Sequence, residues 1–199
     1  MIPESHAAPA LILASTSRYR GELLARLAVP FAAAAPDCDE DAYKSRGFAP
    51  RELAETLALA KAESLRAAHP GAVILGGDQV AEIDGEILGK PGTGAAARAQ
   101  LTRLAGRTHT LITAVAIVHG ARVLRHTDVT RLTMRPLGAE QIARYVAADA
   151  PLDCAGSYKL EQLGIALFSR IESADHTAIV GLPLLALTAM LGEIGIVIP

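Results

Sequence analysis

Ala72-Val73-Ile74-Leu75-Gly76-Gly77-Asp78 is the stretch of sequence that decides the fold. Its first four residues form a continuous apolar run, which is typical of a strand covered on both faces. Two glycines and an aspartate follow immediately, and we expect the strand to end there. Ligands of open α/β sheets gather outside the carboxyl ends of the strands. Asp78 is therefore a candidate site residue, although an aspartate after two glycines is also a common turn.

A second strand is predicted upstream, followed by a polar loop and a helix. The apolar run at residues 10–14 leads into Ser15-Thr16-Ser17, after which Leu23, Leu24 and Leu27 recur with helical spacing. Hydroxyl groups, free N–H groups at a helix start and a guanidinium group are what an anionic phosphate requires. Ser15 and Arg20 are therefore candidate phosphate ligands; an ordinary helix cap with solvated arginines is the alternative.

A lysine interrupts the apolar stripe of the next expected helix, at residues 51–68. Leu53, Leu57 and Leu65 lie on this stripe, and Lys61 falls between them. A lysine in such a position either extends to solvent or meets an anion. Lys61 is therefore a candidate cation of a site.

The rest of the chain predicts further strands and helices. Asp84-Gly85 predicts a hairpin turn between strands at 80–83 and 86–88. After a Gly-Lys-Pro-Gly loop that contains Lys90, Thr93 is placed to cap a helix that runs to about Ala105. The later elements are two strands within 108–134 flanking His119-Gly120, a helix at 137–148, a polar loop at 156–164, a strand at 165–171 and a helix at 182–191.

Composition narrows the class of protein. The chain has 199 residues, 51% of them hydrophobic, and no linker or repeat divides it. We expect a single domain over 1–199 with its core at about 10–193. The net charge is −2 and the basic residues are scattered, so polymeric nucleic acid is not an expected partner.

No segment predicts a secreted or membrane protein. Cys38 and Cys154 lack CxxC spacing and no basic-then-apolar signal opens the sequence, so we expect a cytoplasmic location. Residues 178–191 are almost wholly apolar, but Gly181 and Pro183 interrupt them, and a membrane span needs about 20 apolar residues. We interpret this segment as a buried core helix.

The candidate residues together suit a metal-bound triphosphate. They comprise two carboxylates, two lysines, one arginine and a hydroxyl loop: Asp78, Glu40, Lys61, Lys90, Arg20 and Ser15. Carboxylate oxygens with few histidines indicate Mg²⁺ or Mn²⁺ rather than zinc. Such a set can offset the charge that develops when a phosphoanhydride breaks. Taken alone, Glu40 in its acidic cluster would be a solvated surface residue.

At these residues the sequence closely resembles the Maf-like nucleotide pyrophosphatases, also called the septum-formation inhibitor family. The matching segments, in the family's order, are Leu13-Ala14-Ser15-Thr16-Ser17 with Arg20, Asp39-Glu40, Leu59-Ala60-Lys61-Ala62, Gly77-Asp78-Gln79-Val80, Asp84 to Pro91, Cys154 to Glu161, and Ile179 to Leu184. The resemblance implies an α/β fold of the Maf and inosine-triphosphatase type, with a long central mixed sheet flanked by helices and a cleft between two lobes. It also implies a divalent cation, a homodimer, and Asp78 as the proton acceptor.

Three positions track the substrate within that family. Tyr19, Gln79 and Glu161 stand here, and with them the chain looks like the branch that hydrolyses 7-methyl-GTP. A 7-methylguanine ring carries positive charge, so Tyr19 would attract it by stacking and cation–π interaction. Glu161 can accept both hydrogens from the guanine edge. Arg18 and Gly21 depart from the family's pattern, which usually has a proline and an arginine there.

The hypothesis is a hydrolase that cuts 7-methyl-GTP into 7-methyl-GMP and pyrophosphate. Asp78, with Glu40, would hold the metal, and Asp78 would also take a proton from the attacking water. Arg20, Lys61 and Lys90 would bind phosphate oxygens and stabilise the leaving pyrophosphate. The alternatives are a dTTP/UTP pyrophosphatase of the same family and a nucleotide-binding regulator of septum formation without turnover.

Overall fold

The computed structural model describes residues 9–198. Its strands are β1 (Leu11–Ala14), β2 (Phe31–Ala34), β3 (Val73–Ile83), β4 (Glu86–Leu88), β5 (Thr108–His119), β6 (Arg122–Met134) and β7 (Phe168–Glu172). Its helices are α1 (Arg18–Ala25), α2 (Glu40–Lys44), α3 (Pro50–Ser64), α4 (Gly94–Leu104), α5 (Ala139–Asp149), α6 (His176–Val180) and α7 (Leu184–Glu193), with 3₁₀ turns η1 (Ala155–Ser157) and η2 (Leu163–Leu167).

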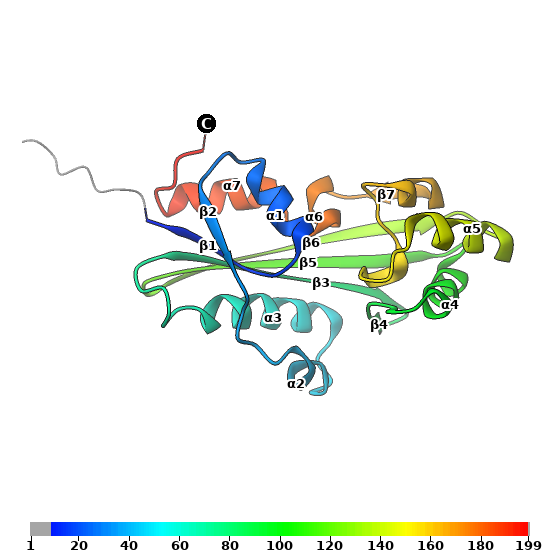
Figure 1. Ribbon diagram of the computed structural model, residues 1–199, viewed down its shortest axis with the longest axis horizontal. Coiled ribbons are helices and arrows are strands. Elements are labelled where there is room, and N and C mark those ends of the chain that lie inside the picture. Colours follow the sequence, from blue (N-terminus) through cyan, green and yellow to red (C-terminus); the bar gives the residue numbers. More distant parts are fainter. Residues whose placement is uncertain (1–8, 199) are drawn as a thin grey trace, which may run out of the picture.

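The strands form a seven-stranded mixed sheet in the order β2-β1-β3-β5-β6-β7, with β4 paired to β3. β2, β1 and β3 run parallel, whereas β3, β5, β6 and β7 are antiparallel neighbours. Helix α3 covers one face of the sheet, and α1 and α7 cover the other (Figure 1). The long central mixed sheet expected from the sequence is therefore confirmed.

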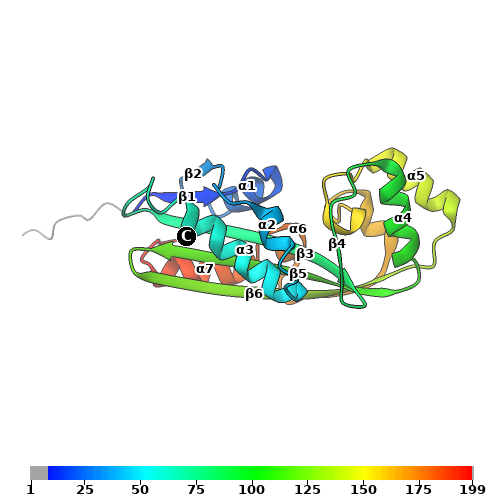
Figure 2. The same ribbon diagram turned by 90° about the horizontal axis from the view of Figure 1, so that it is seen from below.

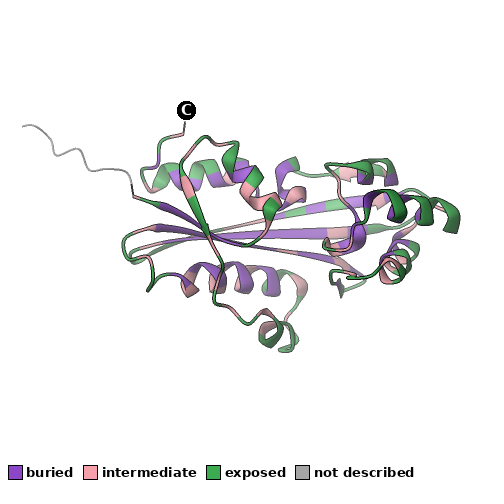
Figure 3. Cartoon of the chain, in the orientation of Figure 1, coloured by how far each residue is buried: buried purple, intermediate pink, exposed green. Residues whose placement is uncertain are grey.

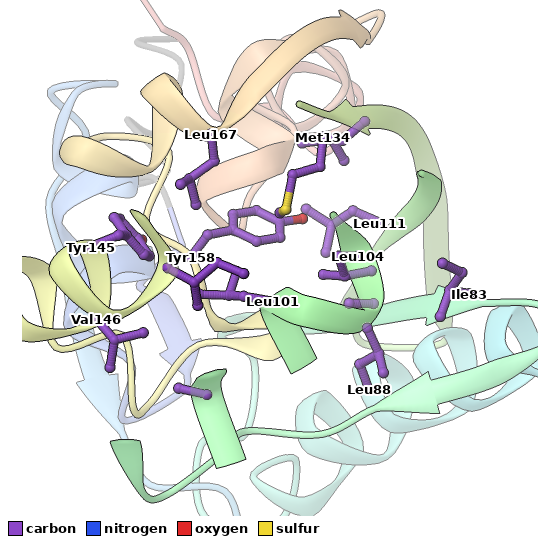
Figure 4. Close-up of a cluster of buried hydrophobic side chains, with 14 of the residues drawn as sticks. Ile83, Leu88, Leu101, Leu104, Leu111, Met134, Tyr145, Val146, Tyr158 and Leu167 are labelled. Atoms are coloured by element: carbon purple, nitrogen blue, oxygen red, sulfur yellow. The ribbon is translucent and has the colours of Figure 1, made fainter. Parts of the chain in front are cut away.

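The molecule has two lobes joined by its longest strands. One lobe contains α1, α2, α3 and α7, the other contains α4 and α5, and β3, β5 and β6 run through both (Figure 2). Each lobe has a buried apolar cluster of its own. In the second lobe Tyr158 lies among leucines of α4 and residues of the long strands (Figure 4). The central strands are buried along most of their length, and the helices bury one side (Figure 3).

Strand β3 does not end at its glycines, which corrects the sequence prediction. It continues to Ile83, so Asp78 lies in the middle of the strand rather than after it. β5 pairs with β3 without interruption from Ile74 to Glu82, and this pairing keeps the glycines extended. Glycine is tolerated inside a strand where another backbone comes close. At Gly76 that backbone belongs to α3.

The other edge of β3 is paired at its two ends only. β1 pairs with β3 up to Gly76, and β4 pairs with it again from Ala81. Between these two strands, residues 77–80 have β5 as their only strand neighbour within residues 9–198. The sheet therefore has an opening at Asp78, between the lobes.

Several predicted boundaries were wrong. The helix expected at 51–68 ends at Ser64, and the strand expected at 165–171 begins only at Phe168, after η2. The apolar segment 178–191 is not one helix: Gly181, with φ +136°, and Pro183 separate α6 from α7. β2, α2 and α6 were missed because each is only four or five residues long. The hairpins at Asp84-Gly85 and Gly120 are confirmed.

Thr93 caps α4 as expected, with its hydroxyl accepting a hydrogen bond from Ala96 N at 3.2 Å. No helix within residues 9–198 combines the length and the apolar character required to cross a bilayer.

Candidate active site

The structure gathers every site residue predicted from the sequence into one cleft of about 1020 Å³ between the lobes. The first lobe contributes Ser15, Tyr19, Arg20, Glu40 and Lys61; β3 contributes Asp78 and Gln79; and the second lobe contributes Lys90 and Glu161. These residues are up to 146 positions apart in the sequence, from Ser15 to Glu161.

Asp78, Lys61 and Glu40 form a row of alternating charges. The Lys61 ammonium lies 2.7 Å from Asp78 Oδ1 and 2.8 Å from Glu40 Oε1. Lys61 and Asp78 are both buried, at 5% and 7% exposure, whereas Glu40 is partly exposed. The lysine predicted to interrupt an apolar stripe therefore meets an anion, and it meets two. Asp78 Oδ2 has no hydrogen-bond or ion-pair partner within the described residues.

Gly76 allows this row to form. A Cβ added at Gly76 would overlap the carbonyl oxygen of Ala58 and lie 2.7 Å from Ala62 N, both on α3. The helix backbone thus rests directly on the strand. Because Lys61 lies between these two helix positions and Asp78 lies two residues along the strand on the same face, the side chains meet.

Glu40 is not a simple solvated residue, contrary to the interpretation of its acidic cluster taken alone. Asp39 caps α2 by accepting a hydrogen bond from Ala42 N, so Glu40 begins the helix. Burial acts to raise the pKa of Glu40, but its hydrogen bond to Lys61 and the charges of Lys61, Lys44 and Lys90 outweigh burial and lower the pKa. Glu40 is therefore held as a carboxylate among three lysines.

Lys44 is a cation of the cleft that the sequence did not reveal. Its ammonium lies 3.7 Å from Glu40 Oε2 and 3.0 Å from Asp41 Oδ1. Lys44 comes to the cleft because α2 begins at Glu40 and ends at Lys44, which places the two side chains one helical turn apart on the same side of the helix. The sequence carried no signal for this helix beyond a mixed charge cluster.

The loop between β1 and α1 places Arg20 against two glycines. Arg20 Nε donates to the Gly181 carbonyl oxygen at 3.2 Å, and Arg20 Nη1 lies 3.5 Å from Ser15 Oγ. A Cβ at Gly77 would lie 3.4 Å from Arg20 Nε, and one at Gly181 would lie 3.3 Å from Arg20 Cγ. Burial lowers the pKa of Arg20, while the charges of Asp78 and Glu40 act to raise it. The guanidinium group is therefore fixed in position beside Asp78.

The first turn of α1 adds further donors beside Arg20. Ser17 caps the helix, with Arg20 N at 3.5 Å from its hydroxyl. The backbone N–H groups of Arg18 and Tyr19 have no hydrogen-bond partner within residues 9–198. Free N–H groups at a helix start are a common feature of phosphate sites.

Lys90 faces this cluster from the second lobe. It is exposed, in the loop after β4, yet its charge lowers the pKa of Glu40. The loop is held by two hydrogen bonds, from Gln100 Nε2 to the Gly89 carbonyl at 2.9 Å and from Gly92 N to the Leu152 carbonyl at 3.0 Å. Cations from both lobes thus converge on the two carboxylates.

Tyr19 and Glu161 lie at an acidic part of the cleft. Burial, together with the neighbouring acidic groups of Cys154, Asp153 and Glu161, raises the pKa of Tyr19 to about 12. Glu161 is exposed and has no hydrogen-bond or ion-pair partner within the described residues. Its carboxylate is therefore available to a ligand.

Three hydrogen bonds hold the segment that carries Glu161. Ser157 Oγ donates to Gln100 Oε1 at 2.5 Å, Tyr158 Oη lies 3.0 Å from His109 Nε2, and Lys159 N donates to Tyr145 Oη at 3.0 Å. The partners come from α4, β5 and α5. Sequence reasoning missed Gln100, His109 and Tyr145, because only the tertiary fold brings them to residues 157–159.

Gln79 is oriented by the protein rather than free. Its Nε2 lies 2.9 Å from the Ala178 carbonyl oxygen, 3.1 Å from that of Ile179 and 3.0 Å from Thr113 Oγ1. Carbonyl oxygens accept only, so they assign the amide nitrogen to this side. The remaining amide oxygen of Gln79 is the group that can contact a ligand in the cleft.

The two departures from the family's pattern have different surroundings. The Arg18 guanidinium lies 5.8 Å from the centroid of the Tyr19 ring and pairs with Glu22 at 3.1 Å. Gly21 has open space around its α-carbon. Arg18 therefore supports the aromatic residue, and nothing in the structure requires a glycine at position 21.

The chain is similar to known proteins along almost its whole length. The chain belongs to the family described as Maf-like protein, which it matches over residues 10–194. It is 51% identical to a protein of Bdellovibrio bacteriovorus named 7-methyl-GTP pyrophosphatase, over 91% of this chain and 95% of that protein. Proteins of the same name from Xanthomonas oryzae pv. oryzae and Bordetella pertussis are 49% and 50% identical, over 96% and 94% of this chain and 100% and 94% of their own lengths.

A solved structure confirms the expected fold type. The HAM1 protein from Coxiella burnetii matches with a TM-score of 0.50, covering 93% of this chain and 99% of that chain. The two sequences are 16% identical, so this likeness concerns the fold alone.

Proposed function

We propose that the protein is a nucleoside triphosphate pyrophosphatase that hydrolyses 7-methyl-GTP to 7-methyl-GMP and pyrophosphate. The observation that carries the proposal is the uneven distribution of charge in the cleft. In its cationic part, cations and free N–H groups surround Asp78. In its aromatic part, Tyr19 lies near the acidic groups of Asp153 and Glu161. The relatives named 7-methyl-GTP pyrophosphatase support the same substrate.

The cationic part suits a triphosphate. Arg20, held by Gly181, and Lys90, on the opposite lobe, are placed to bind phosphate oxygens from two sides. The α1 N-terminus and Ser15 supply neutral donors. Fixed donors of this kind stabilise the charge that develops on a leaving pyrophosphate.

Asp78 is the proposed general base. Lys61 holds one carboxylate oxygen at 2.7 Å, which fixes the side chain and leaves Oδ2 to accept a proton from water. Lys61 also lines the cleft beside the proposed phosphate ligands, so its ammonium can contact a phosphate oxygen as well.

Asp78 and Glu40 are the proposed ligands of a divalent cation, Mg²⁺ or Mn²⁺. Magnesium is usually bound by one or two carboxylates together with substrate phosphates, and the cleft offers two carboxylates beside a phosphate site. No group of three or more His, Cys, Asp or Glu side chains within residues 9–198 is arranged to hold a metal ion. A bound cation would neutralise charge on the phosphates during bond breaking.

The aromatic part suits a cationic base. The ring of Tyr19 can stack on 7-methylguanine, and its attraction to a positive ring is worth about 0.5–2 kcal/mol. Glu161 has both oxygens available for the two donors of the guanine edge. Gln79 would contact the substrate through its amide oxygen.

A panel of triphosphates tests the proposal. The purified protein with Mg²⁺ or Mn²⁺ should release pyrophosphate faster from 7-methyl-GTP than from GTP, UTP or dTTP. A preference for UTP or dTTP would favour the pyrimidine pyrophosphatase. Binding without any pyrophosphate release would favour a nucleotide-binding regulator of cell division.

We also propose a cytoplasmic location, which the two free cysteines support, and a homodimer, which sedimentation would test.

A further inference from the structure

The position of Lys61 has a consequence for the metal site. Its ammonium lies between the two carboxylates that are proposed to bind a divalent cation, 2.7 Å from Asp78 and 2.8 Å from Glu40. The side chain is only 6% exposed, and Lys44 lies near the second oxygen of Glu40. The space that a metal ion would need between these carboxylates is therefore occupied by a cation of the protein itself.

We propose that Lys61 is a built-in cation that excludes the divalent ion from the cleft until a triphosphate arrives. The inference rests on the proposed function, because it takes Asp78 and Glu40 as the metal ligands. The triphosphate offers oxygens to Lys61 and to the metal at once. Lys61 then exchanges a carboxylate for a phosphate, and the ion enters together with its nucleotide.

Electrostatic repulsion favours an exchange of partners by Lys61 over the simple addition of a divalent ion to the cleft. Mg²⁺ binds oxygens at about 2.0–2.1 Å, so an ion held by both carboxylates would lie close to the Lys61 ammonium, which already contacts one oxygen of each. The positive charges of the ion and of the ammonium would then repel each other strongly, because the site is partly buried. Arg20 and Lys44 add further positive charge beside the same two carboxylates. A lone divalent ion gains two carboxylates there but meets at least three cations.

Packing explains why Lys61 cannot leave without a new partner. Helix α3 rests on β3 at Gly76, with Ala58 and Ala62 buried on either side of Lys61. The lysine stem is therefore fixed within the packed interface, and its ammonium cannot reach bulk water without losing both carboxylates. An unpaired buried charge is strongly unfavourable, so a phosphate oxygen has to replace any carboxylate that the ammonium gives up.

Titration of the full-length, nucleotide-free protein with Mn²⁺, followed by the electron paramagnetic resonance of free Mn²⁺, tests the inference. The wild type should bind Mn²⁺ with a dissociation constant no lower than about 1 mM, because a site with one or two carboxylates facing an ammonium is weak. Lys61→Met keeps the apolar stem and removes the charge, and it should bind Mn²⁺ at least about tenfold more tightly. Adding Asp78→Asn to Lys61→Met should abolish this gain.

Lys90→Met is the matched control, since Lys90 lines the same cleft but has no ion pair with Asp78 or Glu40 within the described residues. Its Mn²⁺ affinity should stay within about threefold of wild type. Micromolar Mn²⁺ binding by the wild type would overturn the inference, whether or not Lys61→Met folds. A folded Lys61→Met protein without a gain would overturn it as well.

These results are separable from the fate of the proposed function, because Mn²⁺ affinity is measured without nucleotide. A wild type that hydrolyses 7-methyl-GTP yet binds Mn²⁺ alone tightly refutes the exchange only. A protein that releases no pyrophosphate but shows the gain in Lys61→Met refutes the hydrolase only.

Discussion

Gly76 of β3 and Ala58 of α3 approach so closely that a single methyl group cannot fit between them. This contact sets the height of α3 above the sheet. It thereby sets the distance between the Lys61 ammonium and Asp78, which is 2.7 Å. The site thus depends on Gly76, which is not among the residues that line the cleft.

Gly76→Ala should lower both stability and turnover. The added Cβ would displace α3, and overpacking of this kind costs about 1–3 kcal/mol. Chemical denaturation and steady-state kinetics measure the two effects. Gly21→Ala is the control, because that position has open space in α1 and should gain about 0.5–1 kcal/mol. Equal effects of the two variants would contradict this account.

Asp78→Asn should reduce turnover by about 10²–10⁴, the usual contribution of a positioned general base. The amide keeps an oxygen for the Lys61 hydrogen bond, so circular dichroism should show an intact fold. Asp84→Asn provides the same chemical change on an exposed residue just past the end of β3, where Asp84 pairs with Arg107. It should keep normal turnover. Near-normal activity of Asp78→Asn would remove Asp78 from the mechanism.

The residues that line the cleft were predicted from the sequence more reliably than the elements that carry them. Lys61 was found because a charged residue on an apolar stripe needs a partner, and Asp78 is that partner. The reason given for Asp78 was wrong, since β3 does not end there. A local pattern of two glycines cannot distinguish a turn from a strand that makes room for a helix. That distinction depends on α3, a tertiary neighbour.

The support of the second lobe could not be predicted at all. The pairing of His109 with Tyr158 joins residues 49 positions apart, and neither residue type indicates the other. Lys44 was missed for a related reason: its role depends on α2, a helix of only five residues. Short elements and long-range polar pairs leave little periodicity in a sequence.

His109 should make the fold sensitive to acid. Burial lowers its pKa from 6.5 to about 4, and its Nδ1 has no hydrogen-bond partner among the described residues. Because the unfolded chain binds this proton more readily, stability is complete above pH 6.5 and falls as the pH drops from there to about 4. The full loss is about 3 kcal/mol. Urea unfolding across this range measures it.

The control for the acid effect removes both members of the pair. His109→Val with Tyr158→Phe removes the polar atoms of both partners, so neither is left with an unpaired group, and the stability of this variant between pH 6.5 and 4 should fall less steeply than that of wild type. Identical slopes for the two proteins would assign the acid sensitivity to other groups, such as Glu40 and Asp175, whose pKa values are lowered.

Glu161→Gln should change the choice of base without changing the chemistry. The carboxylate has no partner within the described residues, and three hydrogen bonds hold residues 157–159 just before it, so the variant replaces one atom without breaking a contact. Gln replaces one acceptor oxygen with a donor, which would face the guanine amino group. Bidentate pairing to a base edge is worth about 1–3 kcal/mol, so kcat/KM for 7-methyl-GTP should fall by roughly 5- to 150-fold. Efficiency on UTP should change little.

Two further variants separate base recognition from general effects of charge. Tyr19→Ala should act in the same direction as Glu161→Gln but more weakly, because only the stacking face is removed. Glu140→Gln, an exposed change on α5 in the same lobe, should leave the ratio of kcat/KM values for 7-methyl-GTP over UTP as in wild type. An unchanged ratio in Glu161→Gln would mean that the base is recognised elsewhere in the cleft, and the pyrimidine alternative would then take precedence.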